Sequence, residues 1–305
     1  MSAPTFGRVL SAMVTPFDDD GALDLDAAAA LSAWLTTSQG NEGLVLAGTT
    51  GESPTLTHSE QGELFRAVRS AVSVPIVAGT GSNDTRAAVD LTRRAVEAGV
   101  DGVLVVTPYY NRPSQAALYD HFREVAEAAS DLPMLIYDIP VRSGRKVDTE
   151  TLLNLAHDVD NIVGIKDAAG DVAETAMLLT QAPDGFEIYS GEDKLTLPLL
   201  AVGAVATIGV ATHWTGPEHV RMFDALAAGD LAAATALNAQ MLPSFEFESL
   251  PDAPNPVPTK AMMRMLGHRV GLGRSPMHHV PAGLEAAARA IIEGSGLAIE
   301  AELPE

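Results

Sequence analysis

The chain contains no cysteine among its 305 residues. This absence excludes disulfide bonds, thiol nucleophiles and zinc or iron–sulfur sites held by cysteine. A chain without disulfides suits a reducing compartment, and we therefore expect a cytoplasmic location.

Positive charge is also scarce. The chain has 19 Lys and Arg residues against 40 Asp and Glu residues, which gives a formal net charge of −21 at pH 7. Such a surface repels the phosphates of nucleic acids and of anionic lipids, so we expect neither as a partner. The hydrophobic content of 47% is nevertheless typical of a globular protein with a substantial core.

Long apolar runs are missing as well. The longest uncharged stretch, at residues 195–211, is interrupted by Pro198, Gly203 and Gly209. A buried helix that leads into a buried strand explains this stretch better than a membrane span. The N-terminal segment MSAPTFGRVL lacks the charged start and apolar core of a signal peptide. We therefore expect no association with a membrane.

Short runs rich in valine and isoleucine alternate with longer alanine-rich amphipathic segments. Apolar strands that are each followed by a helix indicate a parallel sheet covered by helices. The first strand lacks the GxGxxG turn of an open doubly wound sheet, and about eight units fit an α/β fold of the (β/α)8 TIM-barrel type. The predicted strands are 9–15, 43–47, 75–78, 102–107, 134–138, 162–166, 187–190 and 205–210. The predicted helices include 26–39, 59–71, 84–98, 115–129, 148–156 and 171–181.

The alternation of strands and helices stops near Gly229. Helices are predicted beyond it at 231–241, 258–266 and 284–293, with a proline-rich joint, LPDAPNPVP, at 250–258. We therefore expect a catalytic barrel over residues 1–229 and a C-terminal helical extension over residues 230–305.

Four predicted strand ends carry hydroxyl, charged or glycine residues. They are AGTTGES (47–53), VTPYYNRP (106–113), YDIPVRSG (137–144) and GIKDAAGD (164–171). In a TIM barrel, the loops that follow the strands form the active site. Any chemistry is therefore expected at these four segments.

Lys166 ends an apolar run and is one of only four lysines in the chain. Desolvation at the mouth of a barrel disfavours the ammonium form and frees the lone pair of the amine. Such an amine can attack a ketone and form a Schiff base. The alternative is a strand that simply ends there, with the Lys166 side chain reaching solvent.

The other segments offer groups that bind anions or move protons. AGTTGES combines backbone amides with two threonine hydroxyls, which suits a carboxylate, although a plain tight turn has the same composition. Tyr137 can transfer protons and Arg142 can bind a carboxylate, but a core tyrosine and a surface arginine would look alike. Three of the five tyrosines fall at candidate strand ends, which favours function. The sequence contains no EF-hand or HExxH spacing, and we expect no metal site.

In this order and spacing, the four segments resemble the dihydrodipicolinate synthase family of pyruvate-dependent class I aldolases. The resemblance begins at AMVTPFDDDG (12–21) and continues through SGED (190–193) to NPVPTK (255–260). It implies a lyase of diaminopimelate and lysine biosynthesis that condenses pyruvate with L-aspartate 4-semialdehyde.

The resemblance also implies a role for each matching residue. Pyruvate would form a Schiff base with Lys166, so that no further cofactor is required. The proton relay would consist of Tyr137, Thr49 and Tyr110. The substrate-binding residues would be Thr50, Gly191 and Ile208 for pyruvate and Arg142 for the aldehyde. Asp138 stands where many members have asparagine, and we expect little effect from this difference.

The family forms homotetramers, built as dimers of dimers, in which the second tyrosine of the YY pair enters a neighbouring active site. Several members are inhibited by lysine. The residues that match the lysine pocket are Ser53, His58, Asn83 and Tyr109. Gln61 replaces a frequent histidine, and Ala87 replaces a glutamate that binds the ammonium of the inhibitor. We therefore predict weak or absent inhibition by lysine, because a charge-assisted contact is lost.

Two other hypotheses remain open. A related aldolase would use the same Schiff base with a sugar acid or another aldehyde, but such enzymes usually lack an arginine at the position of Arg142. The barrel could instead be a non-catalytic binding or scaffold subunit. The joint presence of Lys166, Tyr137, Thr49 and Tyr110 argues against that reading.

Overall fold

A computed structural model gives the structure of residues 3–298. Within these residues, eight strands form a closed parallel barrel in chain order, which confirms the predicted fold class. The strand ends differ from the predicted ones by at most three residues. The strands are β1 (Val9–Ala12), β2 (Gly43–Leu46), β3 (Ile76–Gly79), β4 (Gly102–Val106), β5 (Met134–Asp138), β6 (Ile162–Asp167), β7 (Glu187–Ser190) and β8 (Ala206–Gly209).

The chain divides into two compact units. One is built mainly from Pro75–Ile208, and the other from Arg8–Val74 together with the residues from Gly209 onward. The predicted boundary between residues 229 and 230 stays a prediction.

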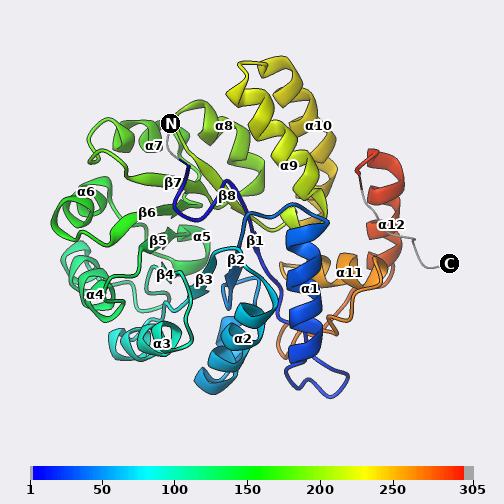
Figure 1. The fold of residues 1–305 in the computed structure, drawn as a ribbon, viewed down its shortest axis with the longest axis horizontal. Coiled ribbons are helices and arrows are strands. Elements are labelled where there is room, and N and C mark those ends of the chain that lie inside the picture. The colour runs from blue at the N-terminus through cyan, green and yellow to red at the C-terminus, as the bar shows by residue number, and fades with distance from the viewer. Residues whose placement is uncertain (1–2, 299–305) are drawn as a thin grey trace. The chain divides into compact units, whose positions relative to one another are not determined.

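In the first unit, helices cover the outer side of the strands (Figure 1). They are α3 (Thr85–Glu97), α4 (Gln115–Ala128), α6 (Thr149–Asp158), α7 (Val172–Leu179) and α8 (Thr196–Ala201). The short helix α5 (Pro140–Ser143) follows β5 directly. On α4, the buried residues Leu118, Phe122 and Val125 recur at helical spacing and pack toward the strands. Each such side chain contributes about 1.5–3 kcal/mol on burial, which holds the helix on the sheet.

In the second unit, the chain adds helices both before and after its strands. They are α1 (Leu25–Thr37), α2 (His58–Ala71), α9 (Thr212–Ala227), α10 (Leu231–Glu248), α11 (Val257–Met265) and α12 (Leu284–Ser295). Helices α9 and α10 lie side by side (Figure 1). Helix α10 runs seven residues past its predicted end at Met241, through Pro243. Its buried residues Ser244, Phe245 and Phe247 show why: packing stabilises the last turns despite the proline.

Side chains cap several of the helices. Asp84 and Asp171, the first residues of two predicted helices, cap α3 and α7. Helix α1 is capped by Asp24, and α2 by a reciprocal capping box between Thr57 and Glu60. These bonds satisfy amides of the first turn that would otherwise lack partners.

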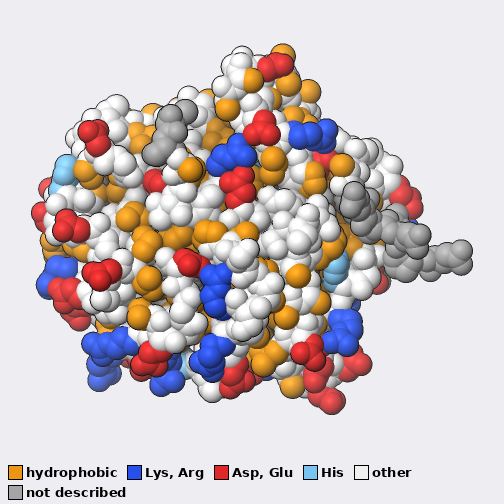
Figure 2. All heavy atoms as spheres, viewed as in Figure 1, with side chains coloured by type: hydrophobic (Ala, Val, Ile, Leu, Met, Phe, Trp, Pro, Cys, Tyr) orange, Lys and Arg blue, Asp and Glu red, His pale blue; other side chains and the backbone are white. Residues whose placement is uncertain are grey.

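The surface carries charges of both signs. Figure 2 shows acidic and basic side chains scattered singly or in small groups on the face that is drawn. Among the described residues, no helix is both long and apolar enough to cross a bilayer.

Candidate active site

Strands β5 and β6 bring Lys166 and Tyr137 together, as the sequence predicts. The two residues are direct partners in the parallel register, so their side chains leave the sheet on the same face. The amine nitrogen of Lys166 lies 4.3 Å from the centre of the Tyr137 ring. Both side chains are buried, with 4% and 5% of their surface exposed. Such burial disfavours the ammonium form of a lysine, while the ring face attracts it.

Gly191 follows β7 and lies against the Lys166 side chain. A Cβ atom at position 191 would come within 2.9 Å of Lys166 Cγ and 3.0 Å of Cε. The amide of Gly191 donates a hydrogen bond of 2.7 Å to the carbonyl of Asp167. A glycine is therefore required here for the lysine side chain to pass. The structure thus joins three of the predicted residues in one buried cluster.

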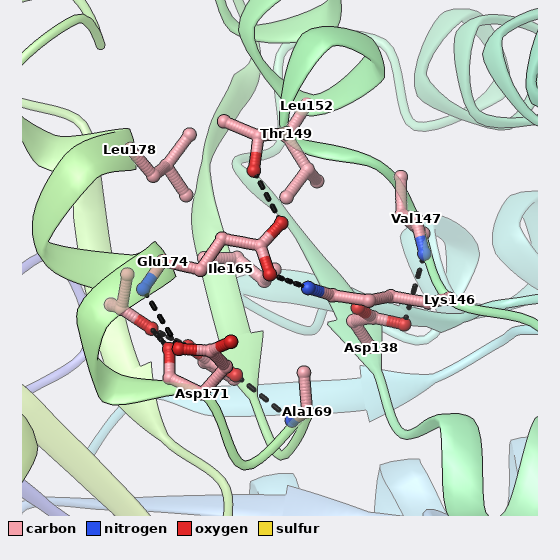
Figure 3. Close-up of a pocket in the computed structure, with 12 residues that line it drawn as sticks. Asp138, Lys146, Val147, Thr149, Leu152, Ile165, Ala169, Asp171, Glu174 and Leu178 are labelled. Carbon is pink, nitrogen blue, oxygen red and sulfur yellow. Dashed lines mark hydrogen bonds and ion pairs between the residues drawn. The ribbon is translucent and has the colours of Figure 1, made fainter.

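A second buried cluster follows the same two strands and was not predicted. Asp138 and Asp167 come directly after Tyr137 and Lys166, and they are also register partners. Figure 3 shows the surrounding pocket, in which Asp138 accepts a hydrogen bond from the amide of Val147 at 3.3 Å. Asp167 accepts from the hydroxyl of Thr175 at 2.5 Å.

The two carboxyl groups differ in their surroundings. Burial, helped by the nearby charge of Asp167, raises the pKa of Asp138 to about 7, against the hydrogen bond from Val147. In the same pocket, Lys146 is paired with Glu174, which also accepts from Thr149. Because successive side chains of a strand point to opposite faces, Asp138 and Asp167 lie on the other face of the sheet from Tyr137 and Lys166. The expectation that Asp138 has little effect in place of asparagine stays a prediction.

Arg142 and Tyr110 lie at the surface of the first unit. Arg142 belongs to α5, and its guanidinium is exposed. Tyr110 is 90% exposed and has a φ of 74°, and its amide donates to the carbonyl of Ser143 in α5. Because its ring is almost wholly exposed, Tyr110 is not packed against the buried Tyr137 of its own chain.

The AGTTGES segment forms a tight turn after β2 in the second unit. Ala47 and Glu52 have φ values of 50° and 56°, in the left-handed region that non-glycine residues rarely adopt. A Cβ at Gly51 would lie 3.0 Å from the amide nitrogen of Ala47, so this position also requires glycine. Thr49 is half-buried and Thr50 is buried. The relation of these two hydroxyls to Lys166 stays a prediction.

Asn255 is a further site residue that the sequence did not single out by itself. Its amide nitrogen donates a hydrogen bond of 2.9 Å to the hydroxyl of Thr50. Asn255 belongs to the NPVPTK motif, which is part of the family resemblance. Because this motif is far from AGTTGES along the chain, a contact between them could not be expected from the sequence. Ile208, the remaining predicted residue, is fully buried on β8.

The chain matches the sequence model of the Dihydrodipicolinate synthetase family over residues 5–294. It is 49% identical to the 4-hydroxy-tetrahydrodipicolinate synthase of Moorella thermoacetica, over 89% of this chain and 92% of that protein. It is 48% identical to the enzyme of the same name from Synechococcus elongatus, over 92% of each chain. Its fold is similar to that of DHDPS from Cyanidioschyzon merolae with lysine bound, with a TM-score of 0.93, 41% identity and coverage of 96% and 99%.

Proposed function

The chain belongs to the dihydrodipicolinate synthetase family, and we propose that it is a lyase with the activity of a 4-hydroxy-tetrahydrodipicolinate synthase. It condenses pyruvate with L-aspartate 4-semialdehyde in the diaminopimelate route of lysine biosynthesis. The contact between the buried amine of Lys166 and the ring of Tyr137 carries this proposal. A Schiff-base enzyme needs both a desolvated amine and a proton-transfer group beside it.

The reaction starts when the Lys166 amine attacks the ketone carbon of pyruvate. Loss of water from the carbinolamine gives a protonated imine, and loss of a methyl proton then gives an enamine. The enamine carbon forms the new bond with the aldehyde carbon of the second substrate. The amino group of that substrate next attacks the imine carbon, closes the ring and releases Lys166. Tyr137 takes and returns protons in these steps, and the covalent intermediate needs no further cofactor.

The two substrates require two anion-binding groups. The hydroxyl of Thr50 binds the pyruvate carboxylate, and Gly191 and Ile208 also bind pyruvate. Thr49 continues the proton relay from Tyr137. Arg142 binds the carboxylate of the aldehyde, which its exposed position on α5 supports.

Tyr110 completes the relay of a neighbouring subunit. Its 90% exposed ring supports this role, because a tyrosine that served its own chain would be packed inside it. The protein therefore acts as a dimer at least, and as a homotetramer built from two dimers.

The proposed function is tested by assays of the purified protein with pyruvate and one of two aldehydes. Turnover with L-aspartate 4-semialdehyde, and little turnover with an N-acylated aldose, is expected because Arg142 matches a carboxylate and not a sugar. The reverse preference would assign the chain to the sugar-acid aldolases. Absence of turnover with either aldehyde would favour a non-catalytic role.

A further inference from the structure

The NPVPTK motif at the start of α11 belongs to the family resemblance but has no role in the chemistry described so far. In the second unit, two of its side chains contact the AGTTGES turn. The amide of Asn255 donates to the hydroxyl of Thr50 at 2.9 Å. The amine of Lys260 lies 2.7 Å from the carboxylate of Glu52, and both of these side chains are 1% exposed. The C-terminal helical extension therefore contacts the AGTTGES turn at both Thr50 and Glu52.

Asn255 is itself held in one orientation. The hydroxyl of Thr259, one turn further along α11, donates to the side-chain oxygen of Asn255 at 3.1 Å. With its oxygen occupied, the amide presents its NH₂ group to Thr50. A hydroxyl that accepts from an amide keeps its own proton for another acceptor. The single proton of the Thr50 hydroxyl therefore remains available for an anion in the turn.

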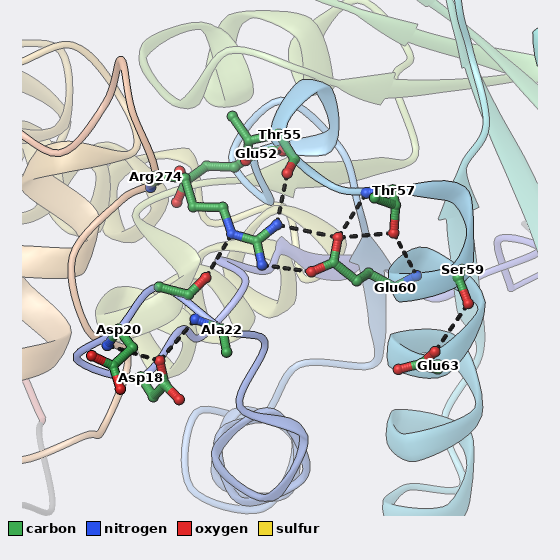
Figure 4. A network of polar contacts seen from close by, with 11 residues as sticks. Asp18, Asp20, Ala22, Glu52, Thr55, Thr57, Ser59, Glu60, Glu63 and Arg274 are labelled. Atoms are coloured by element: carbon green, nitrogen blue, oxygen red, sulfur yellow. Dashed lines mark hydrogen bonds and ion pairs between the residues drawn. The ribbon is translucent and has the colours of Figure 1, made fainter.

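The other end of the turn is held by Glu52. One oxygen of its carboxylate pairs with Lys260, and the other accepts from the amide of Arg274 at 2.9 Å. The guanidinium of Arg274 bonds the carbonyls of Gly21 and Thr55 and the carboxylate of Glu60 (Figure 4). These bonds fix Glu52 in its left-handed conformation. These contacts restrain the turn and therefore keep the hydroxyl of Thr50 within hydrogen-bonding distance of Asn255.

We propose that Asn255 is a positioning residue for the pyruvate carboxylate, because it fixes the Thr50 hydroxyl with its proton directed at the substrate. This inference rests on the proposed function, in which Thr50 binds that carboxylate. The helical extension is then part of the substrate site and not only a structural addition to the barrel.

The substitution Asn255→Asp tests this inference, because it keeps the size of the side chain and reverses its polarity. A carboxylate cannot donate, so the Thr50 hydroxyl must give its proton to Asp and lose it for pyruvate. The apparent KM for pyruvate should rise about 10- to 100-fold at pH 8, the cost of one charge-assisted hydrogen bond. The KM for the aldehyde should change little, and the defect should diminish at lower pH as the new carboxyl is protonated.

Asn154→Asp is the matched control, since it adds the same charge at an exposed residue on α6, outside the motif. It should leave both KM values near those of the wild type. A second pair, Thr259→Val and Thr259→Ser, covers the case in which Asn255→Asp fails to fold. The valine variant should raise the KM for pyruvate, and the serine variant should restore it, because only serine keeps the hydroxyl.

An unchanged KM for pyruvate in folded Asn255→Asp and Thr259→Val proteins would overturn the inference and leave the proposed function standing. Equal increases for both substrates would also overturn it, because they would indicate general damage to the site. If the wild-type protein itself forms no borohydride-trapped adduct with pyruvate, the proposed function fails and this inference fails with it.

Discussion

Two of the four lysines in the chain, Lys166 and Lys260, are buried, and their side chains have different neighbours. Lys260 faces the carboxylate of Glu52 at 2.7 Å, and burial still lowers its pKa to about 8. Lys166 instead meets the ring of Tyr137 and the bare backbone of Gly191. A lysine matched by a carboxylate keeps its charge, whereas one against an aromatic ring and a glycine is accessible to an electrophile. In the proposed mechanism, Lys166 has the chemical role, whereas the ion pair with Glu52 supports a structural role for Lys260.

Replacing Tyr137 by phenylalanine removes one hydroxyl and leaves the ring beside Lys166. Turnover should fall about 100- to 10,000-fold, because proton transfer at the imine loses its positioned group. Steady-state assays would measure this, with circular dichroism to verify the fold. Tyr119→Phe on α4 is the matched control and should keep wild-type turnover. Near-normal activity of Tyr137→Phe would contradict the proposed proton transfer.

Replacing Arg142 by alanine should raise the KM for the aldehyde about 10- to 100-fold and affect pyruvate much less, since one charged hydrogen-bonding partner is lost. Both constants come from the same steady-state assay with each substrate varied in turn. Arg123→Ala, which removes a surface guanidinium on α4, serves as the control. Equal effects of Arg142→Ala on the two substrates would show that Arg142 does not bind the aldehyde selectively.

At this scale, the sequence predicts single residues well where a strand carries them. Lys166 and Tyr137 could be paired because each ends an apolar run, and parallel strands align their ends. Asn255 could not be assigned, because its contact with Thr50 joins segments 205 residues apart. The raised pKa of Asp138 also escaped prediction, because it depends on burial that only the folded chain produces.

At the scale of elements, strands and long helices could be predicted from their periodicity, but short elements and helix ends could not. Helix α5 has only four residues, too few to show a periodic pattern, although it carries Arg142. Helix α10 continues through Pro243 because its last turns are buried, and local propensity does not report tertiary packing. The caps of α1 and α2 lie two residues before the first residues of the predicted helices, because several Asp, Ser and Thr residues near these ends can serve as caps.

The ion pair between Glu60, in the first turn of α2, and Arg274, in the C-terminal extension, can be tested by mutation. Glu60 completes the capping box with Thr57 and also pairs with Arg274 at 2.5 Å. The hydrogen bond from Arg274 lowers the pKa of Glu60 to about 2. Glu60→Gln should therefore lower the free energy of unfolding by roughly 1–3 kcal/mol at pH 7, as measured by urea denaturation.

The pH dependence follows from the direction of that shift. A carboxyl with a lowered pKa stabilises the folded state above its unfolded pKa of 4.5, and this stabilisation disappears as the pH falls toward about 2. The difference between wild type and Glu60→Gln should shrink over that window. Glu63→Gln on the same helix, whose carboxylate accepts from the hydroxyl of Ser59, is the control. A constant difference down to pH 2 would contradict the ion pair.

At the scale of the whole molecule, the fold and family could be predicted from the order of the four strand-end segments, while the prediction on lysine inhibition depends on Gln61 and Ala87, which lie outside these segments. The side chain of Gln61 on α2 is 3% exposed, and its amide nitrogen donates to the carbonyl of Ser53 at 3.3 Å. Ala87 has no charge to offer the ammonium of lysine. We therefore expect the residues that match the family's lysine pocket, Ser53, His58, Asn83 and Tyr109, to be insufficient for strong lysine binding.

We predict that lysine inhibits this enzyme weakly or not at all, even though a similar structure contains bound lysine. The missing glutamate removes a contact of roughly 1.5–3 kcal/mol. Initial rates with lysine titrated at constant pH would measure this. Ala87→Glu should increase sensitivity to lysine relative to the wild type. Half-maximal inhibition of the wild type at low millimolar lysine or below would show the prediction to be wrong.

The central claim is that Lys166 is the nucleophile, and reductive trapping tests it most directly. The protein is incubated with pyruvate and borohydride, and the product is examined by intact mass and peptide mapping. We expect one pyruvate-derived adduct per chain, located on Lys166 and absent from Lys166→Arg. The other lysines, Lys146, Lys194 and the buried Lys260, should remain unmodified. No adduct in the wild type, or an adduct that persists in Lys166→Arg, would contradict the account.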